Sequence, residues 1–245
     1  MDFGQKVSEN NTGRNEICGN PKRRLMENIK LEKMDEFFEN RSASYEEHML
    51  SISHIRNGYK KIAEMIPKNT KKLLDLGCGT GLELIEIFRK LPNIKVTGID
   101  LTKKMLDKLY EKFPGRDIVL INGNYFSHDF GSNIYDVIIS YQTLHHFEHD
   151  IKQKLYKKLF NALTIHGQYI ECDYIALNQE EENFHFRENR NLRIENGVKE
   201  GEFYHYDTPC TVENQIKNME KAGFKSVKEE WREESAAIIR AKKQE

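Results

Sequence analysis

Three glycines follow directly on an apolar run in the segment 71–84, which reads KKLLDLGCGTGLEL. The apolar run is typical of a buried strand, and the residues after the glycines have the spacing of an amphipathic helix. Glycine lets a strand-to-helix connection turn sharply and approach a bound group closely. In an open α/β sheet, ligands bind outside the carboxyl ends of the strands, beside such turns. The segment therefore predicts an α/β fold with a ligand site at Gly77, Gly79 and Gly81.

The rest of the chain alternates between strand-like and helix-like patterns. Strands are predicted at 71–76, 94–100, 117–123, 135–141 and 168–175, and helices at 82–91, 102–113, 149–167 and about 212–222. Strands and helices that alternate in this way indicate a parallel sheet covered on both faces. Two last strand-like runs, 224–231 and 235–243, are joined by so short a connection that they predict an antiparallel hairpin. We therefore predict a doubly wound seven-stranded sheet, mostly parallel with one antiparallel strand near its edge.

Three parts of the chain are distinguished by composition. Residues 1–24 are polar and have no hydrophobic period, which predicts a mobile N-terminal tail. Residues 25–66 show helical spacing up to Pro67 and predict two helices, an N-terminal helical extension. Residues 67–245 form the predicted ligand-binding domain, with a charged and aromatic insert at about 176–210.

Composition limits the partners and the location. The chain carries 38 Lys and Arg against 39 Asp and Glu, so no net field attracts nucleic acid or an anionic membrane. No apolar run approaches ~18 residues, and no signal-peptide pattern opens the chain. The four cysteines form no C-x-x-C pair, which suits a reducing compartment. We expect a cytoplasmic protein with no membrane partner; the oligomeric state is left open.

The predicted second strand ends in Asp100, where a carboxylate can accept hydrogen bonds from both hydroxyls of a ribose. The glycine spacing then selects among nucleoside-containing cofactors. A dinucleotide fingerprint has the order G-x-G-x-x-G, whereas this chain has G-C-G-T-G and places Leu82 where that fingerprint has glycine. The spacing therefore disfavours a pyrophosphate cradle.

LLDLGCGTG together with VTGID resembles the paired motifs of the class I S-adenosylmethionine-dependent methyltransferases, over roughly residues 45–242. The resemblance implies a Rossmann-like transferase whose cofactor is S-adenosylmethionine. It implies that Asp75 lies near the cofactor's amino group and that Asp100 holds its ribose. Asn124 stands where the family commonly has Asp, so it either meets the adenine or is an ordinary turn residue. The full implied cofactor set is Tyr45, Asp75, Gly77, Cys78, Gly79, Gly81, Asp100, Leu101, Thr102, Met105, Asn124, Tyr125, Ser140 and Tyr141.

The run SYQTLHHF after the fourth strand contains two adjacent histidines. We expect no metal here, because adjacent side chains diverge and no acidic residue with ligand spacing stands beside them. The family resemblance favours packing for His146, and His145 is the candidate catalytic base that faces the acceptor. Glu171 and Asp173 share one face of the fifth strand. They are either an acid–base pair at the acceptor, or hydrogen-bond partners of neighbouring loops or of a cationic group on the substrate.

Acceptor recognition is expected outside the shared core. The segment around Tyr45 resembles the part that closes over the cofactor in many small-molecule methyltransferases, so residues 25–66 are assigned as a lid; the alternative is a surface tyrosine. The insert carries Phe186, Tyr204 and Tyr206, which either line an acceptor pocket or seal the insert onto the core. No N/D-P-P-Y/F follows the fourth strand, and Pro209-Cys210 lies too late for a cytosine-C5 enzyme. These absences disfavour a nucleic-acid substrate.

The predicted function is transfer of a methyl group from S-adenosylmethionine to a small-molecule acceptor by in-line displacement. Such a reaction depends mainly on positioning and on exclusion of water, and it needs a base only when the acceptor is protonated. Two alternatives remain at this point. One is a nucleotide-dependent oxidoreductase, and the other is a non-catalytic module that binds S-adenosylmethionine.

Overall fold

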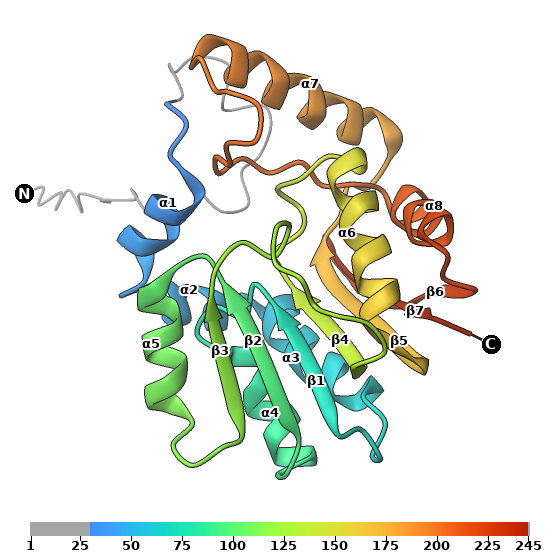
Figure 1. The fold of residues 1–245 in the computed structure, drawn as a ribbon. Helices are drawn as coiled ribbons and strands as arrows, with labels where there is room; N and C mark the ends of the chain where they lie inside the picture. Colours follow the sequence, from blue (N-terminus) through green and yellow to red (C-terminus); the bar gives the residue numbers. More distant parts are fainter. Residues whose placement is uncertain (1–29, 245) are drawn as a thin grey trace, which may run out of the picture. The chain divides into compact units, whose positions relative to one another are not determined.

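The computed structural model describes residues 30–244, and seven strands within them form one sheet in the order β3-β2-β1-β4-β5-β7-β6 (Figure 1). The strands are β1 (Lys72–Leu76), β2 (Lys95–Asp100), β3 (Ile118–Asn122), β4 (Tyr135–Tyr141), β5 (Leu163–Tyr174), β6 (Ser226–Glu233) and β7 (Ala236–Lys242). β1 to β5 pair in parallel, whereas β7 pairs antiparallel with both β5 and β6. This confirms the predicted sheet, with its reversed strand beside the edge.

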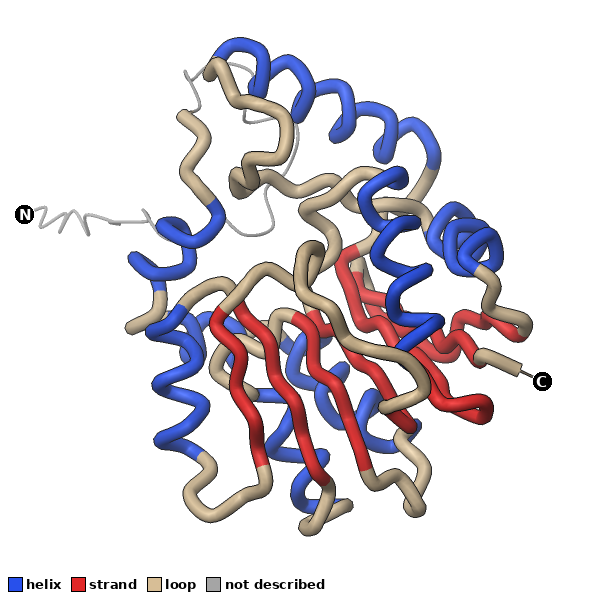
Figure 2. Tube along the Cα trace, in the orientation of Figure 1, coloured by secondary structure: helices blue, strands red, loops and turns tan. Residues whose placement is uncertain are grey.

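Helices cover both faces of the sheet, as Figure 2 shows. They are α3 (Ser53–Met65), α4 (Leu82–Lys90) and α5 (Lys103–Lys112) on one face, and α6 (His149–Ala162) and α8 (Val212–Ala222) on the other. Successive strand residues point to opposite faces, so Leu74 and Leu76 of β1 pack with Leu155, while Leu73 packs with Ile87. All five are buried, which explains why the parallel strands are continuous apolar runs.

The N-terminal segment contains three helices where two were predicted. They are α1 (Met34–Arg41), α2 (Tyr45–Ser51) and α3, and the extended backbone of Ile52 separates the last two. The amide of Met34 donates to the carbonyl of Phe203 at 3.0 Å, and Lys33 forms a bridge with Tyr204. α1 is therefore joined to the segment before α8. The predicted tail, 1–24, and the first residues of the predicted lid, 25–29, lie outside the described residues.

The insert contains a helix that was not predicted, α7 (Gln179–Glu195). The side chain of Asn178 caps it by accepting from the amide of Glu181 at 2.9 Å, and three glutamates occupy its first turn. Both features favour a helix N-terminus. Few apolar side chains of α7 are buried, so its sequence lacks the regular spacing of apolar residues that indicates a helix. The capping residue is the main feature of the sequence that indicates this helix. None of the helices in the described part of the chain is long and apolar enough to cross a membrane.

Glu182 anchors the start of α7 to α6 and α8. Its carboxylate accepts from His149 Nε2 at 2.7 Å, from the amide of Thr211 at 2.6 Å and from Asn214 Nδ2. Burial opposes the charge, but these hydrogen bonds hold the pKa of Glu182 at about 2. The neighbouring Cys210 and Glu182 raise the pKa of His149 to about 9. His149 is therefore an imidazolium at neutral pH and joins the three helices.

Replacing His149 with glutamine is expected to flatten the pH dependence of stability above pH 6.5. A histidine whose pKa is raised on folding from 6.5 to about 9 stabilises the fold fully below pH 6.5 and loses that contribution as pH rises through 9. The melting temperature of the wild type should therefore fall over this range more steeply than that of His149→Gln. His166→Gln, at an exposed position, is the control. Equal slopes in wild type and His149→Gln would contradict the assignment.

Candidate active site

The glycine turn after β1 presents bare backbone at the carboxyl end of the sheet. Gly77 and Gly79 have φ angles of 64° and 47°, which other residues rarely adopt. A Cβ on Gly77 would lie 2.3 Å from Thr143 Oγ1, so the turn after β1 touches the loop after β4 only because Gly77 has no side chain. A Cβ on Gly79 would meet nothing nearer than 3.9 Å. That side of the turn is open to a ligand.

Asp100, the last residue of β2, ties the glycine turn to the start of α5. Its Oδ2 accepts from the amide of Gly79 at 2.9 Å, and its Oδ1 accepts from the amide of Thr102 at 2.8 Å. Burial raises the pKa of Asp100, while the two amides favour the charged form. Each carboxylate oxygen has a further lone pair. The group can therefore still accept two hydroxyl hydrogens from a ligand such as a ribose.

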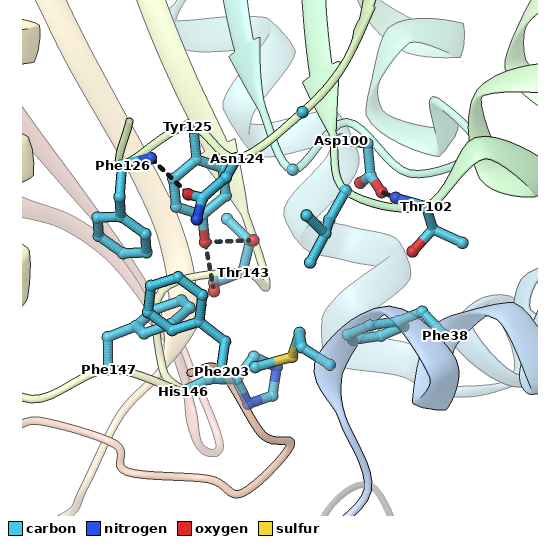
Figure 3. Close-up of a pocket in the computed structure, with 14 residues that line it drawn as sticks. Phe38, Asp100, Thr102, Asn124, Tyr125, Phe126, Thr143, His146, Phe147 and Phe203 are labelled. Atoms are coloured by element: carbon cyan, nitrogen blue, oxygen red, sulfur yellow. Dashed lines mark hydrogen bonds between the residues drawn. The ribbon is translucent and has the colours of Figure 1, made fainter. Parts of the chain in front are cut away.

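A pocket of about 470 Å³ opens beside this carboxylate, and we call it the strand-end pocket. Its lining residues are Met34, Phe38, Gly77, Asp100, Leu101, Thr102, Gly123, Asn124, Tyr125, Phe126, Thr143, His146, Phe147 and Phe203. Asp100 and Thr102 lie on one side, and Phe147, Phe203 and His146 lie on the opposite side (Figure 3). The pocket is thus polar at the ends of β1 and β2 and aromatic at the loop after β4.

Two buried carboxylates, Asp75 and Glu83, lie close to each other beneath the glycine turn. Asp75 is fully buried, and neither of its oxygens makes a hydrogen bond within the described structure. Burial and the nearby Glu83, which is 5% exposed, raise the pKa of Asp75 well above its usual value. Tyr45 lies close by, and burial and the charges of Glu83 and Asp100 raise the pKa of its hydroxyl. Orphaned carboxylate oxygens at this position suit a ligand that carries an ammonium group.

Six of the expected cofactor residues meet in the strand-end pocket: Gly77, Asp100, Leu101, Thr102, Asn124 and Tyr125. The side-chain oxygen of Asn124 accepts from the amide of Phe126 at 2.8 Å, as a turn residue does. Tyr125 lies with its hydroxyl 3.3 Å from Thr143 Oγ1, so the loops after β3 and β4 are in contact. Asn124 therefore both forms its turn and lines the pocket.

Four other expected cofactor residues have side chains that pack in the core and do not line this pocket: Cys78, Met105, Ser140 and Tyr141. Cys78 Sγ packs beside Gly98 of β2, where a Cβ would meet it at 2.8 Å. Ser140 Oγ hydrogen-bonds Tyr169 at 2.7 Å, and the ring of Tyr141 stacks on Tyr59 with centroids 4.3 Å apart. Ser140 and Tyr141 point to opposite faces of β4 and Met105 lies on α5, and all four side chains are buried in the core on one face or the other.

The structure places the two adjacent histidines in positions opposite to those expected. His146, expected to pack, lines the strand-end pocket, whereas His145 is 5% exposed and lies beneath it. The cause is Asp173, whose carboxylate accepts from His145 Nδ1 at 2.5 Å and from the amide of Leu144 at 2.9 Å. Burial lowers the pKa of His145, but the Asp173 carboxylate raises it more, and the net shift is upward.

Glu171 and Asp173 are hydrogen-bond partners of their surroundings rather than groups at the pocket surface. Glu171 is 1% exposed and accepts from the hydroxyls of Tyr156 at 2.8 Å and Tyr169 at 2.7 Å, and from Gln215. Burial and the nearby Asp173 raise the pKa of Glu171 to about 7. In this structure both carboxylates have hydrogen-bond partners within the protein, and a role for either at the acceptor stays a prediction.

The three insert residues expected at the acceptor, Phe186, Tyr204 and Tyr206, are not in the lining of the strand-end pocket. Phe186 and Tyr204 line a second cavity of about 1650 Å³ between α6 and α7, and Tyr206 is buried and lines neither. The second cavity adjoins the first through four shared residues, Phe126, His146, Phe147 and Phe203. Of the insert's aromatic residues, Phe203 is the one that reaches the strand-end pocket, and it was not among the residues expected there.

The comparisons with known proteins agree with this geometry. Residues 73–167 match the family described as "Methyltransferase domain". A phosphoethanolamine N-methyltransferase of Plasmodium falciparum is 26% identical over 203 residues, which is 78% of this chain and 75% of that protein.

Two solved structures share the fold. One is a protein from Nostoc punctiforme PCC 73102 assigned as an O-methyltransferase, with a TM-score of 0.66 and 20% identity, covering 89% of this chain and 64% of that one. The other is human N-acetylserotonin methyltransferase in complex with S-adenosylmethionine, with a TM-score of 0.58 and 16% identity, covering 77% of this chain and 52% of that one. The chain thus spans less than two thirds of either solved chain.

A nicotinamide-dependent oxidoreductase finds no support in the matched domain or in these relatives. The geometry of the site also fits one cofactor. The unpaired carboxylate oxygens of Asp75 and the open backbone at Gly79 suit the amino-acid end of S-adenosylmethionine. The two carboxylate oxygens of Asp100 suit its ribose. The chain belongs to the class I S-adenosylmethionine-dependent methyltransferases, and it is an enzyme that uses S-adenosylmethionine.

Proposed function

We propose that the enzyme methylates a small molecule that is neutral or cationic and has an apolar body. The observation that carries the proposal is the continuity of the strand-end pocket: the same pocket touches Asp100, a cofactor residue, and an aromatic wall of Phe38, Phe147 and Phe203. A small acceptor that enters against the aromatic wall would lie beside the cofactor. The wall buries its apolar surface and excludes water from the reacting atoms.

The charge of the lining argues for the kind of acceptor. Among the residues that line the strand-end pocket there is no Lys or Arg, and the only carboxylate is Asp100. Phosphate recognition normally uses arginine, lysine or a helix N-terminus. The relative from Plasmodium falciparum is named for a phosphorylated substrate, but the lining of this pocket offers no Lys or Arg for a phosphate. Aromatic rings instead attract apolar groups and, through their faces, cations.

The residues would divide the work as follows. S-adenosylmethionine supplies an electrophilic methyl group on a sulfonium sulfur. Asp100 would hold the ribose, Asp75 would meet the ammonium group, and the bare backbone of the glycine turn would lie against the amino-acid end. Met34 and Phe38 of α1 cover the aromatic end of the pocket. Their position supports the assignment of the described part of 25–66 as a lid, and Tyr45 beside Gly79 belongs to the same cover.

The second cavity gives a longer acceptor room to extend. It adjoins the aromatic wall and carries both basic and acidic side chains, among them Lys154, Arg190, Glu148 and Glu200. Because its lining contains both basic and acidic side chains, this cavity favours anionic ligands less than a cleft lined only by basic side chains would. We therefore assign the methylated end of the acceptor to the strand-end pocket.

Replacing Phe203 with alanine tests the assignment of the aromatic wall. Removing the ring should raise KM for the acceptor by about tenfold or more, because truncating a large apolar side chain in a contact costs on the order of 1.4 kcal/mol or more. The Kd for S-adenosylmethionine, measured by calorimetry, should change by less than about twofold. Tyr110→Ala, at a residue 75% exposed on α5, is the matched aromatic control and should change neither constant. Unchanged acceptor kinetics in Phe203→Ala with a lowered melting temperature would assign Phe203 to packing instead.

A further inference from the structure

Two histidines and an aspartate from distant parts of the chain meet beneath the aromatic end of the pocket. His145 and His146 come from the loop after β4, and Asp207 comes from the segment before α8. Their exposed fractions are 5%, 7% and 6%, so all three lie within the protein. The sequence shows no acidic residue with ligand spacing beside the histidines, but the fold brings Asp207, which lies 61 residues after His146 in the chain, next to both of them.

The two rings also do not diverge from this carboxylate. His146 Nδ1 lies 3.3 Å from Asp207 Oδ1, and His145 Nε2 lies 3.7 Å from the same oxygen. Neither contact is a hydrogen bond, and both His146 Nδ1 and Asp207 Oδ1 are buried without a hydrogen-bond partner. His205 Nε2 lies 3.9 Å from that oxygen. Three imidazole nitrogens thus surround one carboxylate oxygen, and none of them makes a well-formed hydrogen bond to it.

These distances are those of atoms that share a metal ion. Zn²⁺ binds histidine nitrogen and carboxylate oxygen at about 2.0–2.2 Å, and in a tetrahedral site this places neighbouring ligand atoms roughly 3.3–3.6 Å apart. A hydrogen bond between nitrogen and oxygen is shorter, about 2.7–3.2 Å. The 3.3 Å and 3.7 Å separations around Asp207 Oδ1 therefore match ligands of one tetrahedral ion better than hydrogen-bonded partners.

The surroundings of His145 have the arrangement that a metal ligand needs. Its Nδ1 lies 2.5 Å from Asp173 Oδ1, and the other oxygen of Asp173 accepts from the amide of Leu144. A proton on Nδ1 that is donated to a carboxylate leaves the lone pair on Nε2, and Nε2 is the atom that faces Asp207. Metal-binding histidines commonly donate their second nitrogen to a carboxylate in this way.

The described structure contains a second cluster of side chains that could bind a metal ion, but its members are hydrogen-bonded to one another and to their neighbours. His149, Glu182 and Cys210 also lie close together. There, however, His149 Nε2 is 2.7 Å from Glu182, and His149 Nδ1 is 2.7 Å from the side-chain amide of Asn218, whose oxygen accepts from the imidazolium once the amide is turned. Both ring nitrogens have partners at hydrogen-bond distance. That cluster is complete without an ion, whereas the one at Asp207 has orphaned atoms.

We propose that His145 Nε2, His146 Nδ1 and Asp207 Oδ1 bind a divalent transition-metal ion, for which Zn²⁺ fits best. Two imidazoles and one carboxylate are a donor set that suits zinc, and His205 Nε2 is near enough to serve as the fourth ligand after a small movement. The ion would join the loop after β4 to the segment 203–207. It would thereby fix Phe147 and Phe203, whose rings meet edge to face at the aromatic side of the pocket, with ring centroids 5.4 Å apart.

The test measures metal binding directly, on the full chain with any affinity tag removed. The protein is stripped with a chelator, dialysed against ZnCl₂ and then against buffer, and its zinc content is measured by mass spectrometry of the elements. The wild type should hold about one zinc ion per chain. Asp207→Asn should bind zinc at least about a hundredfold more weakly, and Asp173→Asn, one step removed, about 10–100-fold more weakly. His166→Gln, at an exposed histidine, is the control and should bind as the wild type does.

A wild type that retains no zinc, or an Asp207→Asn variant that binds zinc as tightly as the wild type, would overturn the proposal. The first result would mean that a protonated His145 lies between the two aspartates without any ion. If Asp207→Asn does not fold, Co²⁺ bound to the wild type decides the matter. A four-coordinate nitrogen and oxygen site should give intense visible d–d bands without a thiolate charge-transfer band. A charge-transfer band would assign the metal to a cysteine such as Cys210, and weak bands would exclude the four-coordinate site.

Discussion

Replacing Asp100 with alanine is expected to weaken S-adenosylmethionine binding by roughly tenfold or more. Hydrogen bonds to a charged group contribute about 1.5–3 kcal/mol, and 1.4 kcal/mol corresponds to a factor of ten in Kd. The substitution also removes the carboxylate that accepts from the amides of Gly79 and Thr102 at 2.9 Å and 2.8 Å. The glycine turn then loses its link to α5, so the binding site loses order as well as a partner for the ribose.

Isothermal titration calorimetry with S-adenosylmethionine measures this effect. Asp107→Ala is the matched control, because Asp107 is an exposed aspartate on α5 that pairs only with Lys103 among the described residues. Its Kd should equal that of the wild type. If Asp100→Ala folds and binds the cofactor as tightly as the wild type, the ribose is not held at the end of β2.

Replacing Asp75 with asparagine should change stability and cofactor affinity in opposite directions. Burial and Glu83 raise the pKa of Asp75 on folding. An acid whose pKa is raised on folding costs stability at every pH above its unfolded value, which is 3.8 here. Asparagine removes that cost, so the cofactor-free variant should melt higher than the wild type at pH 7. A gain of 1 kcal/mol corresponds to about 2–4 °C for a chain of this size. The difference should vanish below about pH 4.

The same substitution should weaken cofactor binding by roughly tenfold or more, because asparagine lacks the charge that meets the ammonium group. Glu83→Gln is the matched comparison. It relieves the same repulsion and should raise the melting temperature, and the ratio of the two variants' Kd values shows which carboxylate meets the ligand. If Asp75→Asn lowers both the melting temperature and the affinity, Asp75 supports the fold and the orphaned oxygens have another explanation.

The fold could be predicted because its signals are local. The apolar runs of β1 and β4 and the helical period of α4 each lie within a dozen residues, and each element buries the face that its period indicates. The glycines and Asp100 were also visible, since a turn at the end of β1 and an acid at the end of β2 must meet at one edge of a parallel sheet. The matched domain confirms the cofactor that their spacing favours.

The acceptor end could not be predicted, because it is made by segments that are distant in sequence. Phe38 comes from α1, Phe147 from the loop after β4, and Phe203 from the segment after α7. Which of two adjacent histidines faces a pocket depends on Asp173, a neighbour 28 residues away from His145. The cap at Asn178, in contrast, was a local signal, and it would have revealed α7.

The central claim is that this methyltransferase acts on a small molecule, and one labelling experiment tests it most directly. The enzyme is incubated with S-adenosylmethionine that carries a trideuterated methyl group and with a whole-cell extract. The extract is then separated into small molecules, RNA and protein. Mass spectrometry should find the trideuteromethyl group in a small molecule without a phosphate, and Phe203→Ala should reduce its rate of appearance. Label that appears in RNA or protein, with the small-molecule fraction unlabelled, would contradict the account.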